Sequence, residues 1–354
     1  MRRNASLLSA SVRKPTSACS IFFCLVVSFL TAQAFSQGPG RSDSKVEVNR
    51  EVYLMGTQCR LQAYAEDRQS GIAQLEALLC VLEKAEEELS TWRPDSLLSR
   101  LNRHPLGSPF PLKRNLFQLF AQLFLWSSAT QSAFDPAIGT LVEAWDLRGE
   151  GRRPSAESLQ EAREQAGVYH LELDAYRHWV ARRRPVKIDA GGFGKGEALD
   201  RLLAPSLEAG YDRWLVDLGG QVMVHGLPPE QDAWEVDLAH PLKRRESVLD
   251  LRLVSGTLAT SGGSERDLEL KGVRIGHILD PRTGLPAAFQ GSVTVWHPRG
   301  LVADILSTAL YVMGVEQGLR WAESQNLAAC YLTITENSVL KIRATSAFRR
   351  RFFN

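Results

Sequence analysis

The sequence reads GHILDPRTGLP at residues 276–286 and ADILSTAL at residues 303–310, and these two stretches carry most of its chemistry. The first is a polar turn in which His, Asp, Arg and Thr stand beside Pro and Gly, the residues that punctuate turns. In the second, Asp304 and Thr308 are four residues apart, so a helix would present both on one face. A carboxylate and a hydroxyl beside an apolar core can hold a hard cation such as Mg²⁺. Together the two stretches favour a metal-assisted site that acts on phosphate.

A glycine-rich turn, DAGGFGKG at residues 189–196, follows an expected strand and opens an expected helix. Glycines let the backbone approach a ligand closely, and a helix N-terminus attracts phosphate. The turn matches neither the Walker A motif nor GxGxxG, and a tight strand–helix connection is an equally good interpretation. Two further glycine pairs, at 219–220 and 262–263, fit hairpins or bulges singly, but together they suggest a crowded, backbone-lined pocket.

The polar turn allows two interpretations of its titratable groups. His277 shares the turn with Asp280 and Arg282, which makes a catalytic or ligand-contact role about as plausible as a structural one. Arg282 can instead brace Asp280 in an ion pair. Asp304 is poorly suited to an apolar helix unless it is paired or metal-bound, although it also stands where a helix N-cap belongs.

The first 34 residues resemble a secretory signal. Basic residues precede an apolar run at 21–30, and Ala32-Gln33-Ala34 is a small-x-small cleavage pattern. The alternative is an uncleaved anchor. The run is too short for an ordinary transmembrane helix, so we expect an exported protein, periplasmic or associated with the outer face of the inner membrane.

Composition sets the remaining limits. The chain has 354 residues, 44% of them hydrophobic, which is ample for a large core. Its formal charge of +2 becomes −2 without the four basic residues of the signal, so nothing points to nucleic acid as a partner.

Outside the signal, Cys59, Cys80 and Cys330 are far apart and are interpreted as buried thiols, with one disulfide still possible. Residues 35–47 read as a flexible leader, 48–345 as the folded domain and 346–354 as a basic, solvated tail.

Expected helices and strands are unevenly distributed along the chain. Helical spacing dominates the first half, at 72–89, 113–130, 150–165 and 195–209, with a hairpin at 169–188 and Asp95 or Ser96 as a helix cap. The second half alternates short strands with turns, between 214 and 344, and has helices at 302–312 and 316–324. This pattern predicts an α+β fold of mixed sheets with flanking helices.

The order of these motifs resembles the ApbE family of FAD:protein FMN transferases, over residues 55–314. The matching segments are MGT (55–57), LSTW (89–92), DS (95–96), LN (101–102), FDP (134–136), IG (138–139), LV (141–142), Trp145, DAGG (189–192), GKG (194–196), Asp200, LGG (218–220), TSG (260–262), ER (265–266), HILDPRTGLP (277–286), AD (303–304) and STA (307–309). The resemblance implies an ApbE-like fold and an enzyme that transfers FMN from FAD to a Thr or Ser hydroxyl of a target protein, releases AMP and requires Mg²⁺.

The resemblance also assigns roles to individual positions. The flavin-binding residues would be Met55, Trp92, Phe134, Asp135, Asp189, Lys195 and Ile278. The metal ligands would be Asp304, Thr308 and the carbonyl of Gly192, and His277 would be the catalytic base or would orient the acceptor hydroxyl. The partners are then FAD and an acceptor protein with a Ser/Thr flavinylation motif, with a membrane involved only through the target or an uncleaved signal.

The chain departs from the family at a few positions, and two other functions stay open. Trp92 stands where the family commonly has Tyr, which keeps a stacking surface but loses the hydroxyl. Ala190, Phe193 and the residues after Gly262 also differ, which affects substrate preference more than chemistry. The same site with water as acceptor would be an FAD pyrophosphatase, and a non-catalytic FAD-binding protein is the third possibility.

Overall fold

The computed structural model describes residues 45–263, 267–270, 273–334 and 339–353. The expected signal, most of the leader, and the motif residues Glu265 and Arg266 lie outside the described residues. None of the described helices is long and apolar enough to cross a membrane.

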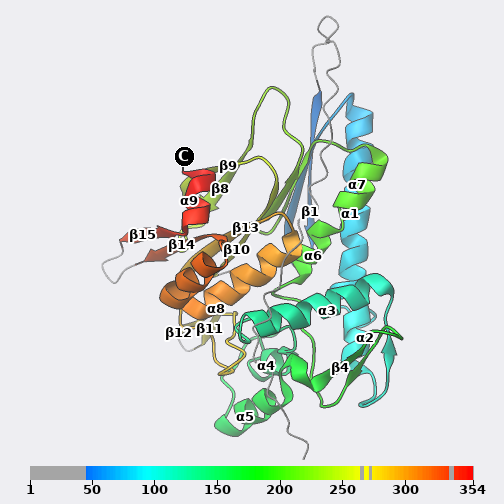
Figure 1. Cartoon of the computed structure of the whole chain (residues 1–354), viewed down its shortest axis with the longest axis vertical. Coiled ribbons are helices and arrows are strands. Elements are labelled where there is room, and N and C mark those ends of the chain that lie inside the picture. Colours follow the sequence, from blue (N-terminus) through cyan, green and yellow to red (C-terminus); the bar gives the residue numbers. More distant parts are fainter. Residues whose placement is uncertain (1–44, 264–266, 271–272, 335–338, 354) are drawn as a thin grey trace, which may run out of the picture. The chain divides into compact units, whose positions relative to one another are not determined.

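An eight-stranded antiparallel sheet organises the described part of the chain (Figure 1). Its strands, in spatial order, are β1 (Val46–Leu54), β2 (Thr57–Ala65), β6 (Trp214–Leu218), β7 (Gln221–His225), β10 (Gly256–Gly262), β13 (Gly291–His297), β14 (Ala328–Ile334) and β15 (Leu340–Ala344). The smaller sheets are β3 (Phe110–Pro111) with β5 (Trp179–Arg182) and β4 (Leu171–Asp174), β8 (Trp234–Ala239) with β9 (Ser247–Leu253), and β11 (Leu268–Leu270) with β12 (Val273–Ile275). The predicted α+β class is confirmed.

The β1–β2 hairpin turns at Met55 and Gly56, with φ of 51° and 71°. Two left-handed residues between strands are typical of a two-residue hairpin turn, because their twist matches that of the strands. The alternating pattern of residues 48–65 thus forms two strands joined at this turn. β1 also begins at Val46, two residues inside the expected leader.

The helices of the described residues are α1 (Arg68–Leu89), α2 (Leu97–Arg103), α3 (Arg114–Ala129), α4 (Gly139–Ala144), α5 (Ala156–Gln165), α6 (Gly194–Asp200), α7 (Leu203–Ala209), α8 (Gly300–Ser324) and α9 (Ser346–Phe352), with a 3₁₀ turn at Val168–His170. As predicted, the Ser96 side chain caps α2 by accepting from the backbone N–H of Ser99. The expected helix at 195–209 is instead two helices, α6 and α7.

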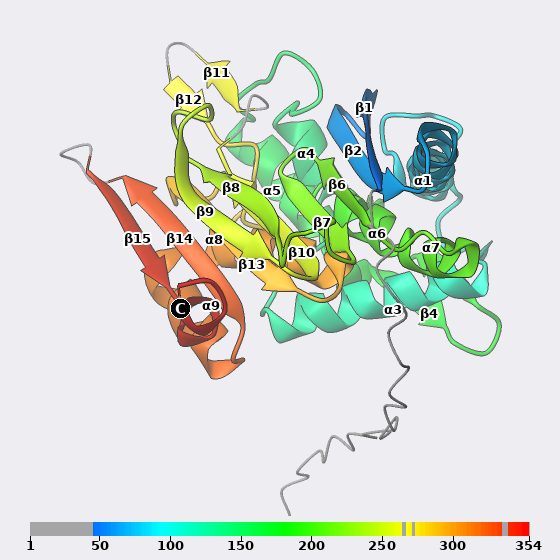
Figure 2. The same cartoon turned by 90° about the horizontal axis from the view of Figure 1, so that it is seen from above.

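The two faces of the main sheet are covered differently, because side chains alternate along each strand. On one face, α1 and α6 pack against β2 and β6, and α8 packs against β13 and β14 (Figure 2). On the other face, the β8–β9 hairpin and α9 pack against β7, β10 and β14. In β14, Cys330 faces the hairpin side and Tyr331 faces α8.

A second apolar core joins α2, α3 and the β3–β5 sheet to α8. Phe120 of α3 and Phe193 of the glycine-rich turn lie in it together with Ile305 of α8, all of them buried. This core fixes the glycine-rich turn against the first half of α8.

Helix α8 contains a non-helical residue, Gly314, with φ of 70° and ψ of 179°. The two helices expected at 302–312 and 316–324 are therefore two halves joined at this glycine. Tyr331 of β14 donates its hydroxyl to the carbonyl of Leu310 at 2.8 Å and lies 3.2 Å from that of Gly314. A side chain from the sheet thus satisfies carbonyls that the break leaves without helical partners.

Residues 346–352 of the expected basic tail form α9, whose Phe348 is fully buried against β14, and the Thr345 side chain caps the helix. Arg349, Arg350 and Arg351 are exposed, as expected for a solvated end. The aromatic residues of the tail supply this anchor, which its basic residues obscured. Cys59 and Cys330 are buried free thiols as predicted, whereas Cys80 is a free thiol on the exposed side of α1.

Candidate active site

Helices α6 and α8 cross at Gly196 with no space for a side chain. A Cβ there would lie 2.2 Å from the carbonyl oxygen of Gly300 and 2.6 Å from the Asp304 Cβ. The close approach lets the Gly196 N–H donate to the Asp304 carboxylate at 2.9 Å. Asp200, at the end of α6, accepts hydrogen bonds from the backbone N–H groups of Gly300 and Leu301. These N–H groups stand at the start of α8 and have no acceptor within that helix.

Asp304 is a buried carboxylate, 2% exposed, on an apolar helix. Burial raises its pKa, and the nearby charge of Lys195 offsets part of that rise. A carboxylate in this position is costly unless a cation or hydrogen bonds compensate it. Its N-cap alternative is wrong, since Asp304 lies inside α8 and its carboxylate bonds to α6.

Gly192 and Thr308 are in direct contact. A Cβ on Gly192 would lie 3.2 Å from the Thr308 Oγ1 and 3.3 Å from the Phe134 ring. Behind Thr308, the Ser261 hydroxyl bonds the Ser307 hydroxyl at 2.9 Å and lies 3.5 Å from the Thr308 Oγ1. Gly192 of the glycine-rich turn thus lies beside Thr308, and Asp304 on the same helix accepts from the N–H of Gly196 in the same turn.

This set of donors suits a hard cation. It contains one carboxylate, one hydroxyl and one backbone carbonyl, all oxygen, as Mg²⁺ prefers. The described residues hold no group of three or more His, Cys, Asp or Glu side chains that could bind a metal. A site with a single carboxylate leaves coordination positions for water and phosphate oxygens.

His277 is paired with a residue that the sequence did not indicate. Its Nδ1 lies 2.7 Å from an oxygen of Asp267, and its backbone N–H donates to the same oxygen at 3.2 Å. The Asp267 side chain is 6% exposed and that of His277 26%. A carboxylate on Nδ1 places the proton there and leaves Nε2 as the basic nitrogen.

Arg282 braces the turn rather than a ligand. It donates to both carboxylate oxygens of Asp280 at 2.8 Å, and the Gly284 N–H closes the turn on the Asp280 carbonyl at 2.8 Å. Next to it, Ile278 packs against the cores that contain the first half of α8. The polar turn is thus rigid and lies against the helix that carries Asp304 and Thr308.

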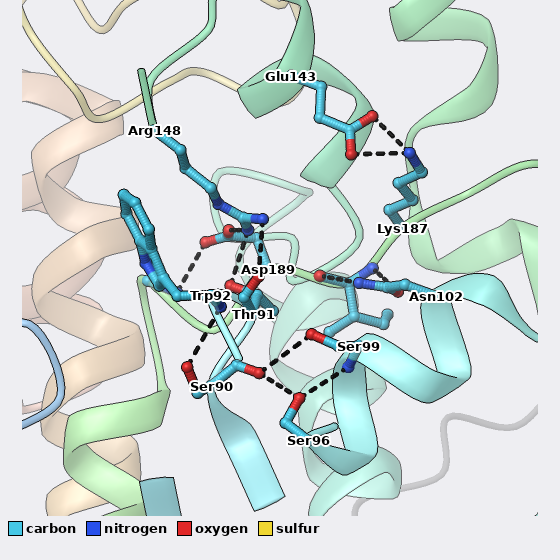
Figure 3. A network of polar contacts seen from close by, with 12 residues as sticks. Ser90, Thr91, Trp92, Ser96, Ser99, Asn102, Glu143, Arg148, Lys187 and Asp189 are labelled. Carbon is cyan, nitrogen blue, oxygen red and sulfur yellow. Dashed lines mark hydrogen bonds and ion pairs between the residues drawn. The ribbon is translucent and has the colours of Figure 1, made fainter. Parts of the chain in front are cut away.

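Trp92 and Asp189 are brought together by Arg148, which the sequence did not indicate either (Figure 3). Arg148 forms an ion pair with the Asp189 carboxylate, and its guanidinium lies over the Trp92 ring, 5.7 Å from the centroid. The other Asp189 oxygen accepts from the Gly191 N–H at 2.8 Å. Trp92 itself is 63% exposed.

Two further predicted flavin residues, Met55 and Asp135, have different surroundings. The Met55 methyl group reaches the glycine-rich turn, 3.6 Å from where a Gly194 Cβ would stand, and its N–H donates to Glu86 at 2.7 Å. Asp135 differs, because it is 5% exposed and its carboxylate accepts from the Ala137 and Val168 N–H groups and from the Ser127 hydroxyl. Its carboxylate therefore holds the backbone of its own loop, and its contact with flavin stays a prediction.

Fold and site together define an α+β protein in which a glycine-rich turn packs against a helix that carries a buried carboxylate, and comparison with known proteins identifies its family. The ApbE family model matches residues 55–332, so the chain belongs to the ApbE family. This confirms the resemblance found in the motifs.

Individual relatives agree over most of their length. The FAD:protein FMN transferase of Vibrio cholerae is 30% identical over 293 residues, covering 80% of this chain and 86% of the relative. That of Klebsiella pneumoniae is 29% identical over 303 residues, covering 83% and 86%. The apo structure of the Pseudomonas stutzeri flavinyl transferase ApbE superposes with a TM-score of 0.78 at 28% identity, covering 88% and 98%. The ApbE protein of Thermotoga maritima gives 0.79 at 28% identity, covering 86% and 99%.

Proposed function

We propose that this protein transfers FMN from FAD to a Ser or Thr hydroxyl of a target protein, in an Mg²⁺-dependent reaction that releases AMP. The observation that carries the proposal is the packing of α8, with Asp304 and Thr308, against the glycine-rich turn, while Ile278 beside His277 packs against the same helix. The relatives named FAD:protein FMN transferase supply the identity of the substrate.

Asp304, Thr308 and the Gly192 carbonyl would hold the Mg²⁺. The bound ion supplies charge that offsets the negative charge developing on the pyrophosphate during transfer. Lys195 adds a further positive charge at the start of α6, where helix N–H groups also favour phosphate. Met55, Trp92 and Asp189 border the same turn and would bind the rest of FAD.

His277 would act on the acceptor. The acceptor oxygen forms a bond to the phosphorus of the FMN half, and the bond from that phosphorus to the AMP oxygen breaks. Nε2 of His277 takes the hydroxyl proton, while Asp267 holds the ring and compensates the charge that it gains. A positioned base of this kind typically contributes about 10²–10⁴-fold to the rate.

Mass spectrometry tests the proposal directly. The chain is incubated with FAD, Mg²⁺ and an acceptor that carries a Ser/Thr flavinylation motif, with EDTA as control. Gain of one FMN on the acceptor, with AMP released only when Mg²⁺ is present, supports it. Free FMN and AMP with an unmodified acceptor would favour the pyrophosphatase, and intact bound FAD would favour a binding protein.

Asp304→Asn isolates the role of the charge, because the amide oxygen still accepts from the Gly196 N–H. The variant should bind Mg²⁺ at least tenfold more weakly and lose turnover while keeping its melting temperature. Lys187→Ala removes an ion pair with Glu143, 2.7 Å long, and serves as a matched control. Full activity in Asp304→Asn would remove the metal assignment.

We also propose that the protein acts outside the cytoplasm. The support is the sequence of residues 1–34 alone. Expression of the whole chain, followed by fractionation and N-terminal sequencing, tests this: a new N-terminus near residue 35 in the exported fraction supports it, and retention in the cytoplasm contradicts it.

A further inference from the structure

Arg148 connects three parts of the candidate site. It lies just after α4 and donates from Nη1 to the Thr91 carbonyl at 3.1 Å and from Nη2 to the Thr91 hydroxyl at 2.7 Å. The same guanidinium forms an ion pair with Asp189 and lies over the ring of Trp92 (Figure 3). One half-buried side chain thus contacts the turn between α1 and α2 and the start of the glycine-rich turn.

Trp92 is unusual among the large apolar side chains near the site, because it is 63% exposed while Phe134 is 2% exposed. An exposed indole on a turn normally samples several rotamers, and each immobilised side chain costs conformational entropy. Here the guanidinium is pinned by Thr91 and Asp189, and a cation over an aromatic ring is attracted by about 0.5–2 kcal/mol. The indole therefore has a fixed neighbour on one side and an open surface on the other.

We propose that Arg148 is a positioning residue that holds Trp92 as a stacking platform for a planar heteroaromatic ring of the substrate. The proposal rests on the proposed function, since FAD supplies two such rings, the isoalloxazine and the adenine. Arg148 itself touches neither the reacting phosphorus nor the acceptor hydroxyl in this assignment.

The geometry also explains why an arginine is needed. Its planar fork contacts the Thr91 carbonyl, the Thr91 hydroxyl and the Asp189 carboxylate at once, whereas a lysine is a single flexible point charge. Asp189 bonds the Gly191 N–H, and Gly192 contacts Thr308. The contacts of Arg148 therefore set the distance between the ring platform and the cation ligands.

The test is a double-mutant cycle on FAD affinity, measured by calorimetry without an acceptor. Arg148→Met and Arg148→Lys should each weaken FAD binding by about 3- to 30-fold, the span of a cation–π contact of this size. Trp92→Ala should weaken it by about tenfold or more, since aromatic stacking contributes about 1–3 kcal/mol per base. In the Trp92→Ala background, Arg148→Met should cause a clearly smaller loss than in the wild-type background, because the main effect of Arg148 acts through the indole.

Two further variants separate positioning from charge. Thr91→Val removes the hydroxyl acceptor with no change in charge and should weaken FAD binding about threefold. Lys187→Met removes a cation of the same region that Figure 3 shows paired with Glu143 instead, and should leave affinity unchanged. Repeating the cycle with FMN and with AMP identifies the ring that stacks on Trp92. The ligand for which the Arg148 and Trp92 substitutions remain non-additive contains that ring.

The outcomes are distinguishable. Additive losses in the cycle, or wild-type affinity in Arg148→Met with an unchanged melting temperature, would overturn the positioning role while leaving the proposed function intact. Absence of FAD binding in the wild-type chain would overturn both. Loss of affinity in Arg148→Met that Arg148→Lys restores would show that charge alone matters, and would also overturn the proposal.

Discussion

Replacing Gly196 with Ala tests the helix crossing on which the candidate site depends. A methyl group there would stand 2.2 Å from the carbonyl oxygen of Gly300, and ordinary contact begins at 3.4 Å, so α6 and α8 would have to separate by about 1.2 Å. The obstacle is backbone, which cannot rotate away. The same separation lengthens the 2.9 Å bond from the Gly196 N–H to Asp304.

The magnitude follows from these contacts. Overpacking of a core typically costs about 1–3 kcal/mol, and a lost hydrogen bond to a charged group about 1.5–3 kcal/mol. Alanine stabilises a helix by about 0.5–1 kcal/mol relative to glycine, which offsets part of this cost. The net destabilisation should therefore be about 2–5 kcal/mol. For a domain of this size that corresponds to a fall in melting temperature of about 3–8 °C.

Differential scanning calorimetry in the absence of ligand measures this effect. Gly276→Ala is the control, because a Cβ at that position meets no atom within 4 Å and should change stability by less than about 0.5 kcal/mol. If Gly196→Ala melts with the wild type, the two helices do not approach as closely as described, and the assembly of Asp304 against the glycine-rich turn loses its basis.

Three further substitutions follow from the contacts described. Phe348→Ala should lower the free energy of unfolding in urea by about 3–5 kcal/mol, because a buried aromatic side chain is lost. A loss below about 1 kcal/mol would indicate that the C-terminal segment is solvated instead. Burial raises the pKa of Asp135 above its ordinary 3.8, so the native state holds that proton more tightly and stability declines as pH rises through the raised pKa. Asp135→Asn should abolish that decline, because an amide does not titrate in this range, and equal pH slopes in the two proteins would contradict this. Asp267→Asn should slow transfer at least tenfold with FAD affinity unchanged, and an unaltered rate would separate Asp267 from the action of His277.

Much of the fold was predictable because short stretches of the sequence carry clear signals for their own secondary structure. Short strands separated by turns were predicted after residue 214, and Trp214–Leu218 and Gln221–His225 are two of them, since each apolar run ends at a glycine or a polar residue. Ser96 was one of two predicted caps because serine before an apolar helical run is a strong signal. That Asp304 and Thr308 share one face of a helix followed from their spacing of four residues.

Other features depend on tertiary contacts that no local pattern encodes. Arg148 and Asp267 acquire their importance from partners 41 and 10 residues away, and neither stands in a distinctive motif. The break between α6 and α7, the burial of Phe348 and the exposure of Cys80 are likewise decided by which surfaces meet. The Asp135 carboxylate is a further example, because it holds backbone N–H groups of Ala137 and Val168, which its motif alone did not indicate.

The glycine break in α8 has a consequence for how this sequence can change. Gly314 ends one helical segment, and the Tyr331 hydroxyl ties the end of that segment to β14. Asp304 and Thr308 lie before the break, in a segment that Tyr331 ties to the sheet. Residues 315–324 follow a glycine whose backbone conformation side chains rarely adopt, and they pack on the same core through residues such as Ala322. The exposed positions of this second segment, Gln317 and Arg320 among them, can therefore be substituted, or carry a fluorophore, with little displacement of Asp304 and Thr308.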